Sequence, residues 1–160
     1  MAKIKPEERF MRMALRKALE GVRKGQTPFG SCIVRGNAVV AAAHNTVWAT
    51  CDPTAHAEVN ALRKAARHLE SIDLSGCVLY STCEPCPMCF SAIHWARIGA
   101  VIFGARIRDA RRLGFNELSV EDRTLKRLGR SPVALVGDFL RDECLDLFRA
   151  WASTPRHRSY

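Results

Sequence analysis

Two short stretches of the chain constrain its fold more than any other feature. The first reads Pro-Thr-Ala-His-Ala-Glu-Val-Asn over residues 53–60, and the second reads Thr-Cys-Glu-Pro-Cys-Pro-Met-Cys over residues 82–89. Together they offer the imidazole of His56, the thiols of Cys86 and Cys89, and the carboxylate of Glu58. Imidazole and thiolate are preferred ligands of zinc, and three protein ligands leave the fourth position of a tetrahedral ion for water. The fold must therefore bring these two distant segments together.

The sequence around each stretch predicts that it opens a helix. Residues 56–69 are rich in alanine and leucine, and Pro87 suits the first turn of a second helix. Cysteines three residues apart at a helix start share one face, so one metal ion can contact both Cys86 and Cys89. The positive end of a helix dipole also favours thiolates and carboxylates. We therefore expect the metal ligands to lie at two helix starts.

The rest of the pattern predicts strands interleaved with helices. Two apolar stretches, Phe29–Arg35 and Ala38–His44, flank a Gly-Asn turn and predict a hairpin. Further strands are expected at 77–81, 100–105 and 133–136, further helices at 6–24 and 142–152, a loop at 45–54, and short helical pieces within the polar segment 106–130. This order predicts an α/β fold, a three-layer α/β/α sandwich around a mixed five-stranded sheet. Residues 1–160 are long enough to form a single domain without disulfides.

Composition and charge narrow the range of partners. No apolar run reaches the length of a membrane span, and the first residues show no signal peptide, so we expect no membrane partner. Three of the seven cysteines lie within seven residues, which suits metal chemistry in a reducing compartment and predicts a cytoplasmic protein. The net charge of +9 is compatible with a nucleic-acid partner, but a solvated arginine-rich surface is the favoured explanation.

A closed metal site is the main alternative to a catalytic one. Cys83 could serve as a fourth ligand, and four-coordinate sites with three cysteines and one histidine are structural. The chain would then be a zinc-stabilised binding module and not an enzyme, and Glu58 would have no role. An iron–sulfur cluster fits less well, because the run lacks a fourth cysteine at the spacing of ferredoxins. In the catalytic interpretation, Cys83 lies at a strand end outside the ligand set.

The two stretches resemble the cytidine deaminase-like superfamily, whose nucleobase deaminases carry the signature H-x-E…P-C-x-x-C. The similarity is greatest to its guanine deaminase branch and includes Pro28-Phe29-Gly30, Asn45, residues 91–97, Gly114-Phe115, and the chain end with Tyr160. The resemblance implies one Zn²⁺ ion per chain, held by His56, Cys86 and Cys89. It implies hydrolysis of guanine to xanthine and ammonia by zinc-bound hydroxide, with Glu58 as the proton shuttle.

The same resemblance implies the residues that bind a purine base. Asn45 would contact the edge of the purine, and Phe29 and Trp95 would lie against its faces. The backbone N–H of Ala57 would hold the reacting oxygen. Glu117 would recognise the amino group or act as a second proton carrier. The branch often has two aspartates where this chain has Asn116-Glu117, so the longer side chain of Glu117 is a departure from the pattern.

The resemblance also implies a homodimer. In this branch the C-terminal segment is exchanged between subunits, so residues 140–160 would form a helix and tail that reach the other subunit. Tyr160 would then close the pocket of that subunit. A frayed chain end is the plain alternative, because terminal residues are often poorly ordered.

Other substrates stay open at this point. A tRNA adenosine deaminase shares the zinc motifs, and the positive charge and Phe103-Gly104-Ala105 favour it. Against it, the stretch after Ala105 lacks the Lys-Thr-Gly-Ala-like run of that family, and Trp95-Ala96-Arg97 stands where that family has His-Ser-Arg. Cytosine, guanosine and aminotriazines are further alternatives, because specificity depends on a few atoms of the pocket.

Overall fold

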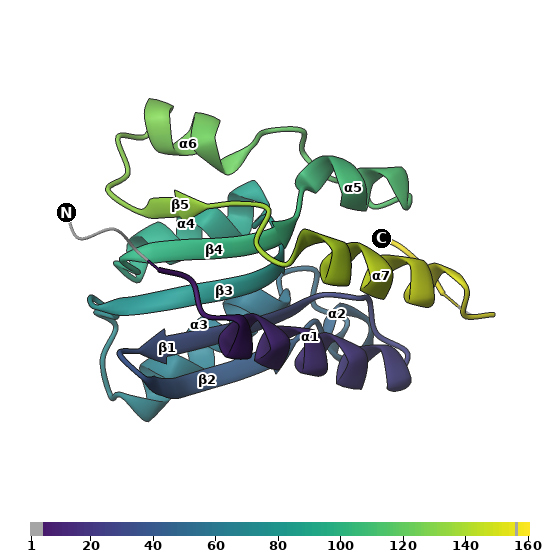
Figure 1. Ribbon diagram of the computed structural model, residues 1–160, viewed down its shortest axis with the longest axis horizontal. Helices are drawn as coiled ribbons and strands as arrows, with labels where there is room; N and C mark the ends of the chain where they lie inside the picture. The colour runs from purple at the N-terminus through teal and green to yellow at the C-terminus, as the bar shows by residue number, and fades with distance from the viewer. Residues whose placement is uncertain (1–4, 156) are drawn as a thin grey trace.

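The protein is described by a computed structural model that covers residues 5–155 and 157–160. A mixed five-stranded sheet has the order β2-β1-β3-β4-β5 (Figure 1). Its strands are β1 (Gly30–Arg35), β2 (Ala38–His44), β3 (Cys77–Cys83), β4 (Ala100–Ala105) and β5 (Ala134–Val136). The strand β1 pairs antiparallel with both β2 and β3, whereas β4 runs parallel to β3 and β5. The predicted mixed sheet is confirmed.

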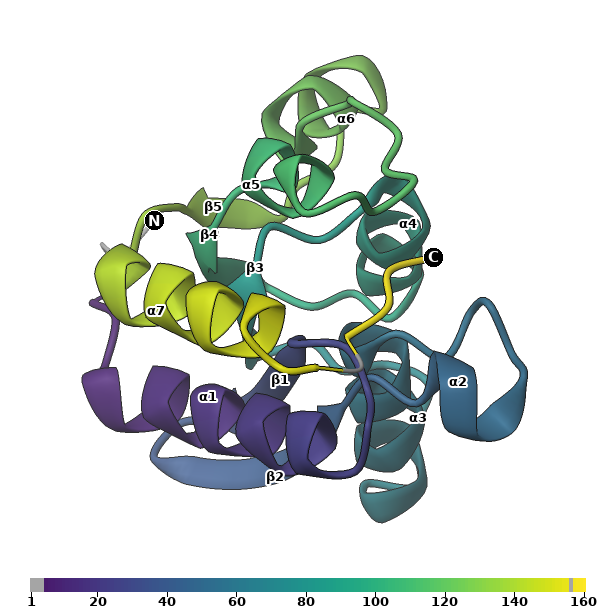
Figure 2. The ribbon, with the colours of Figure 1, turned by 90° about the vertical axis from the view of Figure 1, so that its right-hand side faces the viewer.

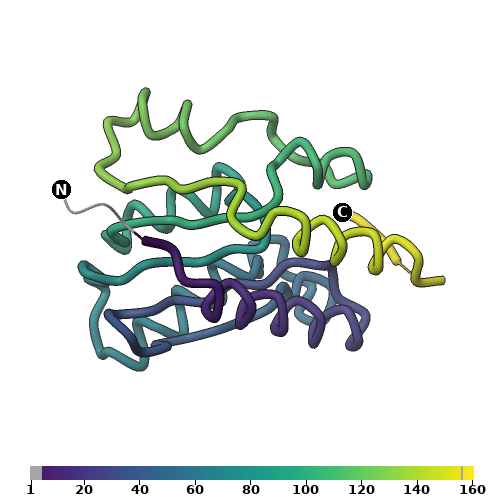
Figure 3. Tube along the Cα trace, viewed as in Figure 1, coloured from purple at the N-terminus to yellow at the C-terminus, as the bar shows by residue number. Residues whose placement is uncertain are grey.

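The helices form the outer layers of the sandwich. They are α1 (Glu8–Arg23), α2 (Val47–Thr50), α3 (Ala57–His68), α4 (Pro87–Trp95), α5 (Ile107–Arg112), α6 (Asp122–Leu128) and α7 (Arg141–Ala152). Figure 2 shows α1 and α7 on one side of the sheet and α3 and α4 on the other. The Cα trace in Figure 3 shows α1 and α7 next to each other, although they lie at opposite ends of the sequence. This is the predicted three-layer α/β/α arrangement.

Side chains alternate along each central strand between two apolar cores. In β1, Cys32 and Val34 face the core under α1 and α7, while Ile33 faces the core under α3 and α4. In β4, Ile102 faces the core under α1 and α7, and Val101 faces the core under α3 and α4. Because both faces of the sheet are covered, its strands are apolar along nearly their whole length, as the sequence predicted.

Several element boundaries differ from the sequence-based expectations. The strand β3 continues to Cys83, two residues beyond the predicted end, because Cys83 still pairs with Ala105 of β4. One helical turn, α2, interrupts the segment that was expected to be a loop. The polar stretch 106–130 holds two helices, α5 and α6. The hairpin turn is as predicted, and Gly36 has a φ of 57°, which suits the first central position of a two-residue hairpin turn.

Three connections lie together at one edge of the sheet, the edge formed by the ends of β2 and β3. The segment from β2 to α3 and the segment from β3 to α4 both end there, at the starts of the two helices. The tail that follows α7 returns across this edge toward α3 and α4 (Figure 2). In the described part of the chain, every helix is too short or too polar to cross a bilayer.

Candidate active site

His56, Cys86 and Cys89 form a compact cluster between α3 and α4. His56 and Cys86 are the residues immediately before these helices, and Cys89 lies one turn further into α4. The Nδ1 atom of His56 is 3.6 Å from Sγ of Cys86 and 3.5 Å from Sγ of Cys89. Tetrahedral zinc, with bonds of about 2.0 Å to nitrogen and about 2.3 Å to sulfur, separates such ligand atoms by about 3.5 Å. The cluster therefore has the dimensions of a zinc site.

The ionisation of the two thiols supports the same conclusion. The hydrogen bond with Cys89 and the nearby His56 lower the pKa of Cys86 to about 4, although burial opposes this. The pKa of Cys89 is raised well above its usual value by its contact with Cys86 and by burial. Without a cation, ionisation of one thiol opposes ionisation of the other. A divalent cation between them would stabilise both thiolates, so the donor set fits zinc.

Cys83 lies outside the cluster. It is the last residue of β3, is buried, and packs in the core under α1 and α7. The group of metal-binding side chains found among the described residues contains His56, Cys86 and Cys89 without it. Burial raises the pKa of the Cys83 thiol well above its usual value, so the group stays neutral. The geometry therefore favours a three-ligand site over the closed four-ligand site.

Glu58 faces the cluster from the first turn of α3. Its side chain is buried, its Oε1 accepts a hydrogen bond of 3.1 Å from Ser81 Oγ, and its Oε2 is 3.6 Å from Sγ of Cys89. Burial raises the pKa of Glu58, and the hydrogen bond from Ser81 opposes this shift. A carboxylate with a raised pKa beside a metal site is suited to accept a proton and to release it again. Ser81, which orients Glu58 from β3, was not identified from the sequence.

Asn45 and Tyr160 meet on the other side of the site. Asn45 is almost fully buried at the end of β2, and its Nδ2 donates a hydrogen bond of 2.6 Å to the Tyr160 hydroxyl. The Tyr160 ring lies 5.7 Å from the His56 ring and 5.6 Å from the Phe115 ring, between centroids. The tail is held further by the main-chain oxygen of Tyr160, which accepts a hydrogen bond from the Asn116 N–H. Within this single chain, Tyr160 covers the site of its own subunit.

Glu117 lines a hollow beside the metal cluster. The hollow has a volume of about 380 Å³ and is bounded by Pro53, His56, Cys86, Pro87, Met88, Asn116, Glu117, Leu118 and Tyr160. Burial, followed by the nearby Cys86, raises the pKa of Glu117 to about 7. A larger hollow of about 870 Å³ lies near Ile72 and Trp95, but no residue of the metal cluster lines it. The smaller hollow therefore is the candidate substrate site.

The three other predicted substrate residues lie at different distances from this hollow. Ala57 is fully buried at the start of α3, between His56 and Glu58. The Phe29 ring packs against Phe115, with 4.9 Å between ring centroids, and so supports the site from behind. Trp95 is 82% exposed at the far end of α4 and is not brought to the site within one chain.

Phe115 also supports the site, although the sequence identified it only as part of the Gly114-Phe115 pair in the family resemblance. Its ring contacts Phe29, Trp151 and Tyr160. It therefore links the sheet, α7 and the tail behind the hollow. The sequence signal was its place in the Gly-Phe pair just before Glu117, which gave no indication of these contacts.

Comparison with protein families matches residues 4–105 to the family described as the cytidine and deoxycytidylate deaminase zinc-binding region. This match covers more than half of the chain and includes both zinc-binding stretches. It ends at the last residue of β4, before the segment that carries Glu117 and before α7 and the tail.

Individual relatives extend the similarity to the rest of the chain. The guanine deaminase of Bacillus subtilis is 39% identical over 154 residues, which cover 96% of this chain and 98% of that protein. A solved structure of guanine deaminase from Nitrosomonas europaea has a TM-score of 0.86 at 26% identity, covering 94% of this chain and 87% of that one. A tRNA-specific adenosine deaminase of Aquifex aeolicus is 46% identical, but only over 99 residues, 62% of this chain and 66% of that protein.

Proposed function

The chain belongs to the zinc-dependent cytidine and deoxycytidylate deaminase family, and we propose that its substrate is guanine, which it hydrolyses to xanthine and ammonia. The observation that carries this proposal is the position of Tyr160 over the metal cluster. Tyr160 lines the hollow and restricts access to it. Its hydroxyl accepts a hydrogen bond from Asn45, and its ring lies beside the ring of His56. A free base fits under such a cover, whereas a nucleotide in an RNA loop must stay connected to its backbone on both sides.

The orientation of the Asn45 amide supports a purine with an acceptor on its edge. The Oδ1 atom of Asn45 accepts a hydrogen bond of 3.0 Å from the Val47 N–H, so the Nδ2 group is the end of the amide that faces Tyr160. An amide NH2 group has two hydrogens, and Tyr160 uses only one of them. The second can donate to a ring nitrogen or carbonyl of guanine.

Glu58 is the residue that moves protons in the proposed reaction. Zinc held by His56, Cys86 and Cys89 would act as a Lewis acid and make water a nucleophile at neutral pH. Glu58 takes one proton from that water and gives it to N3 of guanine as the oxygen bonds to C2. It then takes the second proton and gives it to the 2-amino group, which leaves as ammonia when the C2–N bond breaks. The oxygen from water becomes the 2-oxo group of xanthine.

The remaining site residues bind and orient the base in this proposal. Glu117 contacts the departing amino group or carries a second proton, Ala57 donates its backbone N–H to the reacting oxygen, and Phe29 supports the ring of the base through Phe115. Trp95 is too far from the hollow to contact the base within one chain. We therefore propose a homodimer in which Trp95 reaches the site of the other subunit. We further propose that segment 140–160 is exchanged in this dimer, so that the contacts of Tyr160 with Asn45 and His56, which form within one chain in the structure, form between subunits. The cluster of free thiols suits a cytoplasmic location.

Deamination of adenosine in RNA is the second candidate. The local identity of 46% to a tRNA-specific adenosine deaminase and the net charge of +9 favour it. That similarity covers 62% of this chain, whereas the similarity to a guanine deaminase covers 96%. The full-length similarity and the closing tail favour the free base.

Ammonia release from a panel of substrates tests the proposal. The panel contains guanine, guanosine, cytosine, cytidine, adenine, the aminotriazine ammeline, and a tRNA anticodon stem-loop. We expect release from guanine, with xanthine as the product by its ultraviolet spectrum. Release of ammonia from the stem-loop alone would show that the substrate is RNA and that the basic surface binds it. If every member is inert in a protein that holds zinc, the metal site is structural.

A further inference from the structure

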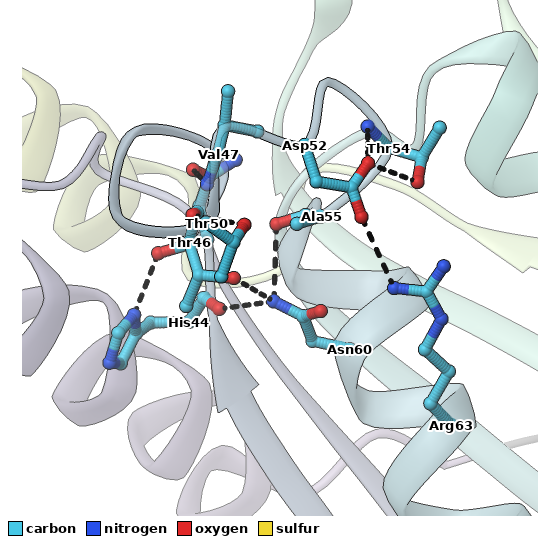
Figure 4. A network of polar contacts seen from close by, with 10 residues as sticks. His44, Thr46, Val47, Thr50, Asp52, Thr54, Ala55, Asn60 and Arg63 are labelled. Carbon is cyan, nitrogen blue, oxygen red and sulfur yellow. Dashed lines mark hydrogen bonds and ion pairs between the residues drawn. The ribbon is translucent and has the colours of Figure 1, made fainter.

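The segment between Asn45 and His56 joins the substrate side of the site to the metal side. It leaves β2 after His44, forms the single turn α2, and returns to α3 (Figure 4). Its inner part is held by local hydrogen bonds, such as those that the N–H and hydroxyl of Thr54 donate to Asp52 Oδ1. The two ends are only one backbone hydrogen bond apart, because the Thr46 N–H donates to the Ala55 carbonyl over 3.0 Å.

Asn60 lies between the two ends of this segment. Its Nδ2 atom is 3.0 Å from the His44 carbonyl, 3.0 Å from Thr46 Oγ1, and 3.1 Å from the Ala55 carbonyl. Its backbone N–H donates to the carbonyl of His56 over 2.9 Å. One half-buried amide group therefore contacts the residue before Asn45, the residue after it, and the residue before His56 (Figure 4).

The chemistry of these contacts requires an amide at this position. All three partners of the side chain are oxygen atoms, and two of them are carbonyl oxygens that can only accept. An asparagine supplies two N–H donors on a short, rigid side chain. A carboxylate of the same size would face these oxygens without a donor, and an alanine would leave the two carbonyls without their side-chain partner.

We propose that Asn60 is a positioning residue that holds Asn45 in register with His56. Asn45 is also supported from the other side, because its N–H donates to the Phe29 carbonyl over 3.1 Å. Asn60 supplies the connection to α3, the helix that carries Glu58 and follows His56. The assignment of Asn45 to substrate rests on the proposed function, whereas the contacts of Asn60 do not.

Loss of this amide should separate substrate positioning from metal binding. In Asn60→Ala the three metal ligands are intact, so we expect full zinc content. Misplacement of catalytic groups by about 1 Å costs on the order of 100-fold in rate, so we expect kcat/KM for guanine to fall about 10- to 100-fold. The backbone amide of Thr46 should exchange with deuterium faster, while the amides of β1 and β3 keep their protection. Asn60→Asp should be at least as impaired as Asn60→Ala.

Arg63→Gln is the matched control. Arg63 lies one turn further along α3 and contacts the middle of the same segment through Asp52, 3.7 Å away (Figure 4). Its ion pair is with Asp52, in the middle of the segment and not at either end, so zinc content, kinetics and exchange at Thr46 should match the unmodified protein. This control separates a specific effect of Asn60 from any change in charge or helix propensity on this face of α3.

The outcomes are distinct. Asn60→Ala with kcat/KM and Thr46 exchange within about twofold of the unmodified protein would refute the positioning role, since a misplaced group should cost far more. Loss of zinc, or faster exchange throughout β1 and β3, would show that Asn60 serves folding only and would also refute it. If the unmodified protein is inactive on guanine, the proposed function fails, and the zinc and exchange measurements still decide the role of Asn60.

Discussion

The metal side of the site lies on the first turns of two helices, whereas the substrate side lies on a strand end, a loop and the last residue of the chain. The metal side consists of His56, Glu58, Cys86 and Cys89, and the substrate side, as we propose it, of Asn45, Glu117 and Tyr160. On the metal side, each helix fixes its residues through its own backbone. On the substrate side, the central contact joins Asn45 to a residue 115 positions away.

This difference suggests that chemistry and specificity can vary independently in the fold. The metal side needs only two helix starts that meet at the edge of a sheet. Apart from Asn45, the substrate side depends on the segment after β4, on α7 and on the tail, all of which lie outside the region matched by the family. Variants can therefore be chosen that change one side and leave the other intact.

The largest effect is expected from Glu58→Gln, which affects the metal side alone. Glutamine keeps an acceptor for Ser81 but cannot take up a proton, so kcat should fall by about 10²- to 10⁴-fold while zinc content and KM stay close to normal. Metal analysis and steady-state ammonia release measure the two effects. Ser81→Ala, which leaves the carboxylate in place, is the control and should lose far less. Substantial turnover in Glu58→Gln would exclude the proton-shuttle role.

Deletion of Tyr160 should have an intermediate effect on the substrate side. The deletion removes the hydroxyl that accepts a hydrogen bond from Asn45 and the ring that lies beside His56. It also removes the main-chain oxygen that accepts a hydrogen bond from the Asn116 N–H. We expect kcat/KM to fall about 10- to 100-fold, because substrate positioning is lost. Thermal stability should change less than activity, since Tyr160 lies outside the helices and strands, beyond the end of α7 at Ala152.

Tyr160→Phe separates the parts played by the ring and the hydroxyl. It keeps the ring and the main-chain oxygen but removes the hydroxyl that accepts a hydrogen bond from Asn45, so its loss of activity should be smaller than that of the deletion. An unchanged rate after deletion would mean that the tail does not close the site. Mixing the deletion variant with Glu58→Gln tests exchange of the tail, since activity restored in mixed dimers requires a tail that serves the other subunit.

The sequence predicted the metal side almost completely, and the reason is local. Cys86 and Cys89 share a helix face because they are three residues apart, and Pro87 marks the start of that helix. The apolar strands likewise predicted a sheet covered on both faces. Such features depend on residues that are close in sequence, so their spacing carries the information.

The substrate side could be predicted only by resemblance, because its contacts are long-range. Nothing in the residues near Tyr160 indicates that its hydroxyl reaches Asn45, and nothing near Trp95 indicates that it is exposed. Asn60 belongs to the first quoted stretch, yet a helical pattern shows only that its side chain lies on the same face as His56. Its three oxygen partners depend on how the segment before α3 folds back.

The smallest effect is expected from Cys83→Ala, which tests the boundary between the metal side and the core. Cys83 lies three residues before Cys86 in sequence, but its side chain is buried under α1 and α7 and does not join the metal ligands. Removing the sulfur leaves a small cavity, so the free energy of unfolding should fall by about 1 kcal/mol. Zinc content should stay at one ion per chain, and kcat/KM should stay within about threefold, because the three metal ligands and Glu58 are unchanged. Cys86→Ala is the control and should lose the metal. Loss of zinc from Cys83→Ala would instead make it the fourth ligand of a closed site, and a closed site would leave no position for water and no use for Glu58.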